Sequence, residues 1–185
     1  ATIRRQRQMC IRDRPLSIRF GDDEYTDREQ LSVDRFYELL ASSDTLPETA
    51  APSPGRFAES FQRHLDAGAT AIVCINISAA LSATMQSAIT AADSMDADIR
   101  VVDSTSITVG LGSIVIAAAE AAKNGASADE VVAIAESMSA RTHVFGALDT
   151  LENLQKGGRI GGAQALLGSM LSIKPLIDIS TGEVE

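Results

Sequence analysis

The stretch Ala71-Ile72-Val73-Cys74-Ile75-Asn76-Ile77 is almost continuously apolar and rich in β-branched side chains. Such a run is typical of a strand that is covered on both faces, as in a parallel sheet. A loop with several hydroxyl residues and a helical pattern through Ala92 follow, and Ile99–Asp103 then supplies a second strand. The order strand, loop, helix, strand predicts a βαβ unit. The expected fold class is therefore α/β with a doubly wound parallel sheet.

The residues on either side of this unit predict further elements. Leu16–Phe20 alternates apolar and polar residues like a strand, and Gly21 turns the chain toward a second short strand. Ser32, Ser53 and Ser127 are each followed by a helical pattern and are suited to begin a helix, whereas three prolines between Leu46 and Gly55 predict irregular backbone. Later elements are expected as helices at 109–123, 128–140 and 148–155, a helix ending near 171, a third parallel strand at 143–148, a strand at 176–179 and a hairpin beginning at 181.

Composition and charge exclude several classes of protein. Hydrophobic residues make up 45% and charged residues 22% of the chain, as in globular proteins. The apolar runs are far shorter than the roughly 20 residues that a membrane span needs. The net charge is −9, and because residues 1–14 hold five Arg against one Asp, the other 171 residues carry 11 basic and 24 acidic side chains. An acidic surface repels phosphate groups, so neither nucleic acid nor an anionic membrane is an expected partner.

Cysteine and histidine are scarce. Cys10 and Cys74 cannot form a disulfide framework, which favours a cytoplasmic location. No group of Cys, His and carboxylate residues has the spacing of a metal site, so neither a metal nor a cofactor is expected. No G-x-S-x-G motif is present, and His64 and His143 are more readily explained as structural or solvent-exposed residues. Catalysis by a triad is therefore not expected.

The first 14 residues differ from everything that follows. They have no apolar periodicity, no helix cap and no apolar segment of a signal peptide, and Gln8–Arg14 resembles translated adapter sequence. We therefore expect a foreign segment at 1–14 and an α/β domain at 15–174. Residues 175–185 are expected to begin a second α/β domain that is almost entirely missing.

A glycine-rich loop at Lys156–Gly162 combines two cations with many backbone N–H groups. Lys156 and Arg159 could hold an anion or contact a partner there. The loop matches neither the P-loop nor the dinucleotide-binding pattern, and a tight turn with solvated charges is the competing interpretation. A small-molecule transferase or other enzyme that uses this loop as an anion site is one alternative function, and a pure interaction module is another.

Two loops rich in hydroxyl residues, 49–53 and 78–87, are the best candidates for a binding site. Ser82 and Thr84 follow the buried strand, and ligands of parallel α/β sheets bind outside the carboxyl ends of the strands. Hydroxyls and helix N-terminal amides can hold a carboxylate without a permanent positive charge. The competing interpretation is that these residues only cap helices.

Five ordered segments match motifs of one known family. A T-S-Q-P-S-P loop is similar to Thr49–Pro54, and an I-S-S-x-L-S-G-T-Y-Q-S-A segment is similar to Ile77–Ala88. The motifs V-x-V-V-D-S, L-x-x-L-x-K-G-G-R-I and G-x-L-L-x-I-K-P are similar to 99–104, 151–160 and 168–175. The chain thus resembles the DegV family from about Pro15 to its last residue.

The resemblance implies a protein that binds a long-chain fatty acid such as palmitate or oleate and performs no catalysis of its own. Where the family's role is understood, a fatty acid kinase partner phosphorylates the presented carboxylate for phospholipid synthesis. By position, Thr49 and Ser82 are implied to hydrogen-bond the carboxylate, with Ser78 as a weaker candidate.

The chain departs from the family pattern inside these same motifs. Alanines replace the family's Ser, Gln, Ser and Gly at Ala50, Ala51, Ala79 and Ala83. The family's opening strand with a D-S-T motif and the carboxylate-contacting histidine of its C-terminal domain have no counterpart here. The headgroup geometry is therefore expected to differ, and this length of chain is not expected to enclose the ligand alone.

Overall fold

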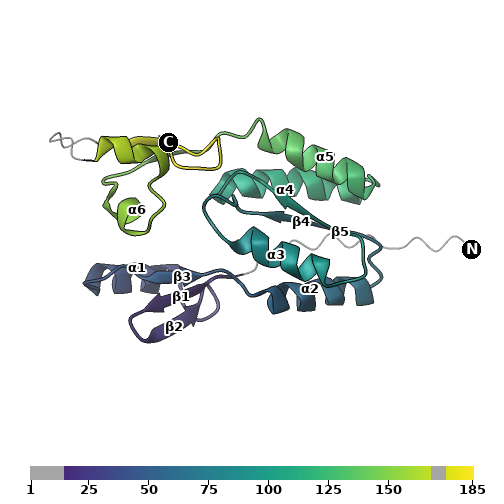
Figure 1. Ribbon diagram of the computed structural model, residues 1–185, viewed down its shortest axis with the longest axis horizontal. Helices are drawn as coiled ribbons and strands as arrows, with labels where there is room; N and C mark the ends of the chain where they lie inside the picture. The colour runs from purple at the N-terminus through teal and green to yellow at the C-terminus, as the bar shows by residue number, and fades with distance from the viewer. Residues whose placement is uncertain (1–14, 168–173) are drawn as a thin grey trace, which may run out of the picture.

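A computed structural model describes residues 15–167 and 174–185, and its centre is a parallel pair of strands (Figure 1). β4 (Ile72–Asn76) and β5 (Ile99–Asp103) pair in register from Ile72 opposite Ile99 to Asn76 opposite Asp103. The crossover between them contains α3 (Thr84–Asp93). The predicted βαβ unit is confirmed.

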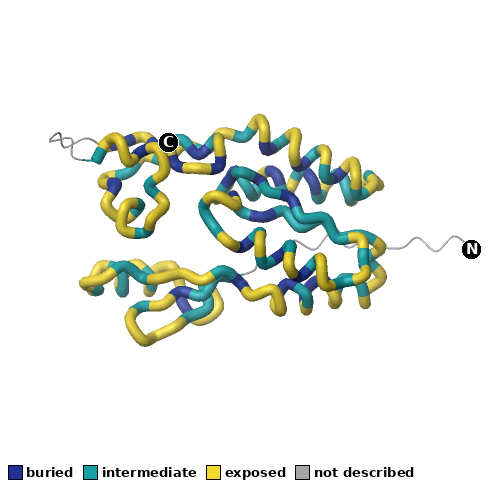
Figure 2. Tube along the Cα trace, in the orientation of Figure 1, coloured by how far each residue is buried: buried dark blue, intermediate teal, exposed yellow. Residues whose placement is uncertain are grey.

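Helices cover both faces of this parallel pair. α2 (Pro54–Asp66) and α3 pack on one face, where Ile72 and Cys74 meet the buried side chains Phe57, Phe61, Ala88 and Ala91. α4 (Thr108–Lys123) and α5 (Ala128–Ser139) pack on the other face, where Val73 and Ile75 meet Val102, Ile114, Ala118, Val131 and Ala135. Successive residues of a strand point to opposite faces, so alternate side chains of β4 enter two different cores. Every residue of β4 and β5 is intermediate or buried, as Figure 2 shows for the strands between the helices. The predicted α/β fold class is confirmed.

Hydroxyl side chains begin three of the helices where the sequence predicted caps. Ser53 accepts a hydrogen bond from the Arg56 backbone N–H at the start of α2, where proline occupies the first turn. Ser127 forms a reciprocal capping box with Glu130, whose pKa is lowered by hydrogen bonds from the Ser127 backbone N–H and hydroxyl. Ser32 caps α1 (Val33–Ser42) in the same way as Ser53.

A separate antiparallel sheet precedes these layers. Its strands β1 (Ser17–Phe20), β2 (Asp23–Thr26) and β3 (Glu48–Ala50) lie in the order β2-β1-β3. The hairpin of β1 and β2 is confirmed, but the prediction of irregular backbone at 46–55 is wrong for β3. Pro47 and Pro52 flank β3 without entering it, and its place at the edge of the sheet requires only one neighbour.

The predicted third parallel strand at 143–148 is also wrong. β6 (Phe145–Ala147) pairs antiparallel with β7 (Leu176–Asp178), outside the sheet of β4 and β5. The short apolar run did not specify its partner, and the returning segment at 176–178 supplies the hydrogen-bonding groups instead. Phe145 and Leu176 are exposed on one face of this pair, and Ile177 is buried on the other.

The segments between β6 and β7 are shorter than expected. α6 (Glu152–Lys156) starts late because the Thr150 hydroxyl accepts a hydrogen bond from the Glu152 N–H. The segment expected to be a helix ending near 171 is a 3₁₀ helix, η1 (Gly161–Leu166), and residues 168–173 lie outside the described residues. The predicted foreign segment at 1–14 lies outside them as well.

The last residues pack against this region. Leu151, Ala163, Ile177, Ile179 and Val184 form one buried cluster. Glu185 exchanges two backbone hydrogen bonds with Asp178, so the chain turns back at 181–183 as the sequence predicted. The division into domains at 174 stays a prediction. In the part of the chain described, no helix is long and apolar enough to cross a bilayer.

Two glycines of α4 provide a matched test of this packing. A methyl group added at Gly110 would lie 2.5 Å from Val144 Cγ2 and would overlap the Ser106 hydroxyl, whereas one added at Gly112 meets nothing within 4 Å. We expect Gly110→Ala to lower the free energy of unfolding by about 1–3 kcal/mol. Gly112→Ala should raise it by up to about 1 kcal/mol, because alanine favours a helix over glycine.

Urea unfolding of the complete gene product, followed by circular dichroism, measures both changes. Shifts of equal size and sign would contradict close packing of α4 against the residues before β6.

Candidate functional site

The carboxyl ends of β4 and β5 lie at the same edge of the parallel pair, and the loops that leave them are hydrogen-bonded together. The Ser104 N–H donates to Asn76 O at 3.1 Å, and the Ser78 N–H donates to Ser106 O at 3.0 Å. The Asp103 carboxylate accepts from the N–H of Ala79 at 3.3 Å and from the N–H of Thr105 at 2.8 Å. Asp103 therefore joins the two loops, and we call residues 78–84 and 103–106 the carboxyl edge.

Ser78 is buried in this edge. It is 1% exposed, and its hydroxyl donates to Gly182 O at 2.6 Å. Gly182 has a φ of +91°, and a Cβ there would lie 2.9 Å from Ser78 Oγ, so a side chain would be strained and crowded. Ser78 thus fastens the turn after β7 to the loop after β4. Its predicted contact with a ligand stays a prediction.

Ser82 lies at the surface of the same loop. It is half-buried, its Oγ lies 2.8 Å from Thr84 Oγ1, and it accepts the Thr84 backbone N–H at 3.3 Å. The N-cap residue of α3 is Ala83, which offers no side-chain cap. Ser82 therefore satisfies one amide at the start of α3 while part of its side chain remains accessible.

The structure separates the two cations of the glycine-rich loop. The Arg159 guanidinium donates to Leu81 O through Nε at 3.4 Å and to Gly157 O through Nη1 at 2.6 Å. Arg159 thus reaches the residue beside Ser82. Lys156 instead pairs with Glu152 at 2.5 Å, and this pairing lowers the pKa of the Glu152 carboxyl.

A pocket of about 200 Å³ opens beside Lys156, between α6 and the segment after α1. It is lined by Leu40, Ser43, Asp44, Thr45, Leu46, Glu152, Asn153 and Lys156. Its volume is below the roughly 300 Å³ at which pockets for drug-sized ligands begin. Neither Thr49 nor Ser82 lines it, so this pocket is not the binding site that the sequence predicted.

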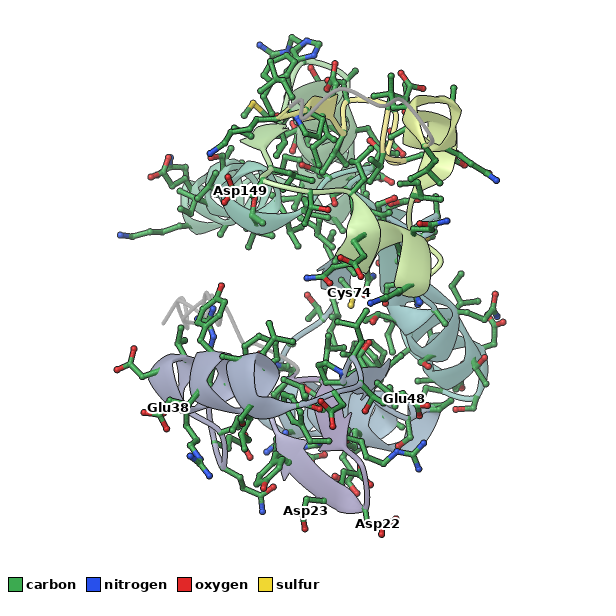
Figure 3. All side chains as sticks on the ribbon, turned by 90° about the vertical axis from the view of Figure 1, so that its left-hand side faces the viewer. Asp22, Asp23, Glu38, Glu48, Cys74 and Asp149 are labelled. Atoms are coloured by element: carbon green, nitrogen blue, oxygen red, sulfur yellow. The ribbon has the colours of Figure 1, made fainter. Side chains whose placement is uncertain are left out.

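Thr49 lies on β3, in a different sheet from β4, the strand that Ser78 and Ser82 follow. It is exposed and stands opposite Ile18 in the register of β1 and β3. Its neighbour Glu48 points to the other face of the strand and forms an ion pair with Arg19. In Figure 3, Glu48 lies with Asp22, Asp23 and Glu38 on the part formed by α1 and the small sheet. Within the described residues, no hydrogen bond joins Thr49 to Ser82.

His143, Ser180 and Asp178 lie together like the residues of a catalytic triad, but their hydrogen bonds do not activate the serine. His143 Nδ1 lies 2.8 Å from Ser180 Oγ, and the Ser180 hydroxyl donates to Asp178. That hydrogen bond is the main cause of a lowered pKa for the Asp178 carboxyl. The serine proton is directed to the carboxylate and not to the histidine, whereas an activated serine needs the base as its acceptor. In residues 15–167 and 174–185, no three His, Cys, Asp or Glu side chains are grouped to hold a metal ion.

The sequence did not single out two contacts at this edge. The pairing of Ser82 with Thr84 had a local signal, since a serine two residues before a threonine at a helix start often forms such a turn. The contact between Ser78 and Gly182 joins residues 104 positions apart, and no sequence pattern indicated it.

Removing the buried hydroxyl of Ser78 tests how much its hydrogen bond to Gly182 stabilises the protein. We expect Ser78→Ala to lower the free energy of unfolding by about 1–3 kcal/mol, because Gly182 O loses its buried donor. Ser113→Ala removes an exposed hydroxyl on α4 that bonds only its own helix and should change stability by less than about 0.5 kcal/mol. Chemical denaturation of both variants in parallel makes the comparison, and equal effects would show that the Gly182 contact contributes nothing.

The chain matches a protein family and several of its members. The family model described as "Uncharacterised protein, DegV family" matches residues 8–185. The chain is 39% identical over 171 residues to a DegV domain-containing protein of Streptomyces coelicolor, covering 92% of this chain and 60% of that relative. It is 37% identical to another from Deinococcus radiodurans, with the same coverage. The chain therefore spans about 60% of the length of the curated relatives that it matches.

Solved structures of proteins from the same family superpose on this chain. A DegV family protein of Thermus thermophilus, described by its fatty acid binding, superposes with a TM-score of 0.85 at 35% identity, over 92% of this chain and 61% of that one. The Bacillus subtilis protein DegV, described as a fatty acid binding protein, gives a TM-score of 0.78 at 29% identity, with the same coverage. A stearic acid-binding protein of Eubacterium ventriosum gives 0.78 at 29% identity, over 92% and 60% of the two chains.

Proposed function

Because this chain belongs to the DegV family, we propose that its protein binds a long-chain fatty acid, such as palmitate or oleate, with the carboxylate at the carboxyl edge. The observation that carries the proposal is the half-buried Ser82 hydroxyl beside the backbone reached by Arg159. A hydroxyl donor and a nearby guanidinium are suited to an ionised carboxylate. Fatty acid binding is described for the Thermus, Bacillus and Eubacterium relatives, which supports a fatty acid as the ligand.

The acyl tail supplies the affinity in this proposal. Burying about 15 methylene groups at about 0.8 kcal/mol each offers roughly 12 kcal/mol before the costs of association. Long-range charge works against an anion here, because residues 15–50 carry nine acidic and three basic side chains. Directed donors therefore orient the headgroup, while apolar burial holds the molecule.

Thr49 is proposed as a second donor to the same carboxylate, with Ser78 as a weaker one. Thr49 is exposed on an edge strand, so its hydroxyl is available to a ligand. Ser78 is only 1% exposed, so its hydroxyl could contact the carboxylate only if the ligand reached below the protein surface.

We further propose that the protein is a cytoplasmic carrier without catalysis of its own, which presents the carboxylate to a fatty acid kinase for phospholipid synthesis. Arg159 is exposed beside the headgroup position and is proposed to contact the anion or this partner. Lys156 is a second candidate for partner contact. The enzyme alternative used the Lys156–Gly162 loop as an anion site, and the pairing of Lys156 with Glu152 gives that alternative no support.

Native mass spectrometry tests the ligand class. The complete gene product, purified from a bacterial host, is expected to carry an additional mass equal to a C16 or C18 fatty acid. A spectrum that stays free of ligand after incubation with oleate would overturn the proposed function.

The two leading hydroxyls are tested together by titration with oleate. Thr49→Ala with Ser82→Ala should weaken binding by about tenfold or more for each hydrogen bond lost to the carboxylate, with an unchanged circular dichroism spectrum. The control variant, Thr90→Ala with Ser113→Ala, removes two exposed helix hydroxyls and should bind as the unaltered protein does. An unchanged affinity in the first variant would remove Thr49 and Ser82 from the site.

A further inference from the structure

The hydrogen bonds of Ser82 and Thr84 determine which of the two hydroxyls is free to act. A hydroxyl has one hydrogen to donate and two lone pairs to accept with. Ser82 Oγ already accepts the Thr84 backbone N–H at 3.3 Å, which occupies one lone pair. The remaining question is the direction of the 2.8 Å contact between Ser82 Oγ and Thr84 Oγ1.

Burial favours one direction. Thr84 is 8% exposed, and in the described residues its hydroxyl meets no acceptor other than Ser82 Oγ. Buried donors are almost always paired, so the Thr84 hydroxyl hydrogen is directed at Ser82. Ser82 is half-buried and can donate outward, whereas Thr84 is buried.

The two bonds from Thr84 then fill both lone pairs of Ser82 Oγ. What remains to Ser82 is its single hydrogen, which must be directed away from α3. A group in this state can donate to an acceptor and has no lone pair left for a donor. An ionised carboxylate is the stronger acceptor, whereas an alcohol accepts more weakly and can use its own hydrogen only where a lone pair is free.

From this geometry we infer that Thr84 is a positioning residue: its hydroxyl fixes Ser82 as a dedicated donor, so that the edge favours the ionised carboxylate, which is the stronger acceptor, over a neutral headgroup. This inference rests on the proposed fatty-acid site and adds its headgroup specificity. Thr84 acts through Ser82 and needs no contact with the ligand.

The test compares oleate with oleyl alcohol, which has the same tail and a neutral headgroup that can donate or accept. Both are titrated into the complete gene product and into Thr84→Val, which keeps the branched shape and removes the hydroxyl. Without the Thr84 hydroxyl, nothing holds the Ser82 hydrogen toward the ligand, so we expect up to about tenfold weaker binding of oleate. Binding of oleyl alcohol should stay within about twofold, because the alcohol can donate to Ser82 instead.

Two further variants keep the result interpretable. Thr84→Ser retains the hydroxyl and should restore the preference for the acid, including where Thr84→Val is too unstable to assay. Thr90→Val makes the same change at an exposed position of α3 and should leave both affinities unchanged.

The outcomes separate this inference from the function on which it rests. Failure of the unaltered protein to bind oleate would overturn the proposed function, and the inference with it. Normal binding by the unaltered protein with full oleate affinity in Thr84→Val would overturn the positioning role alone. Equal losses for oleate and oleyl alcohol, or a loss of acid preference in Thr84→Ser, would also reject the positioning role and reduce Thr84 to a packing residue.

Discussion

The parallel register of β4 and β5 is the constraint on which the candidate site depends. Both strands are covered by helices on both faces, so a shift of one residue would exchange the side chains assigned to the two cores. This register brings the carboxyl ends of the strands to one edge, where the Asp103 carboxylate bonds the Ala79 amide of the other loop. The position of Ser82 thus follows from the packing of alternate apolar residues along β4.

The carboxyl edge offers uncharged hydroxyl groups as hydrogen-bond donors, although the protein as a whole is acidic. The net charge is −9, and residues 15–50, which include Thr49, carry nine acidic side chains, of which Figure 3 labels Asp22, Asp23, Glu38 and Glu48. Net charge therefore cannot attract an anion, and in the proposed site recognition comes from hydroxyl groups with fixed directions and from the nearby guanidinium of Arg159. Such short-range donors discriminate by geometry, which suits a ligand whose affinity resides in its tail.

Local patterns predicted much of the fold, and long-range pairing limited the rest. The β-branched run of β4, the periodicity of the helices and the serine caps at Ser32, Ser53 and Ser127 all act within a few residues, so the sequence indicated them correctly. β3 and β6 are three residues each, and their state depends on partners far along the chain. The same limit applies to the site: the place of Ser82 followed from local order, whereas the burial of Ser78 depended on Gly182.

The hydrogen bond from Ser78 to Gly182 also has a kinetic meaning. It closes a loop of 104 residues, and contacts of such separation form late because the chain entropy of closure must first be overcome. We therefore expect the edge to be completed near the end of folding, so that a partly folded chain that already has its βαβ unit lacks a finished version of the proposed headgroup site. A ligand held there binds the native state in preference to earlier states, so occupancy and global stability rise together.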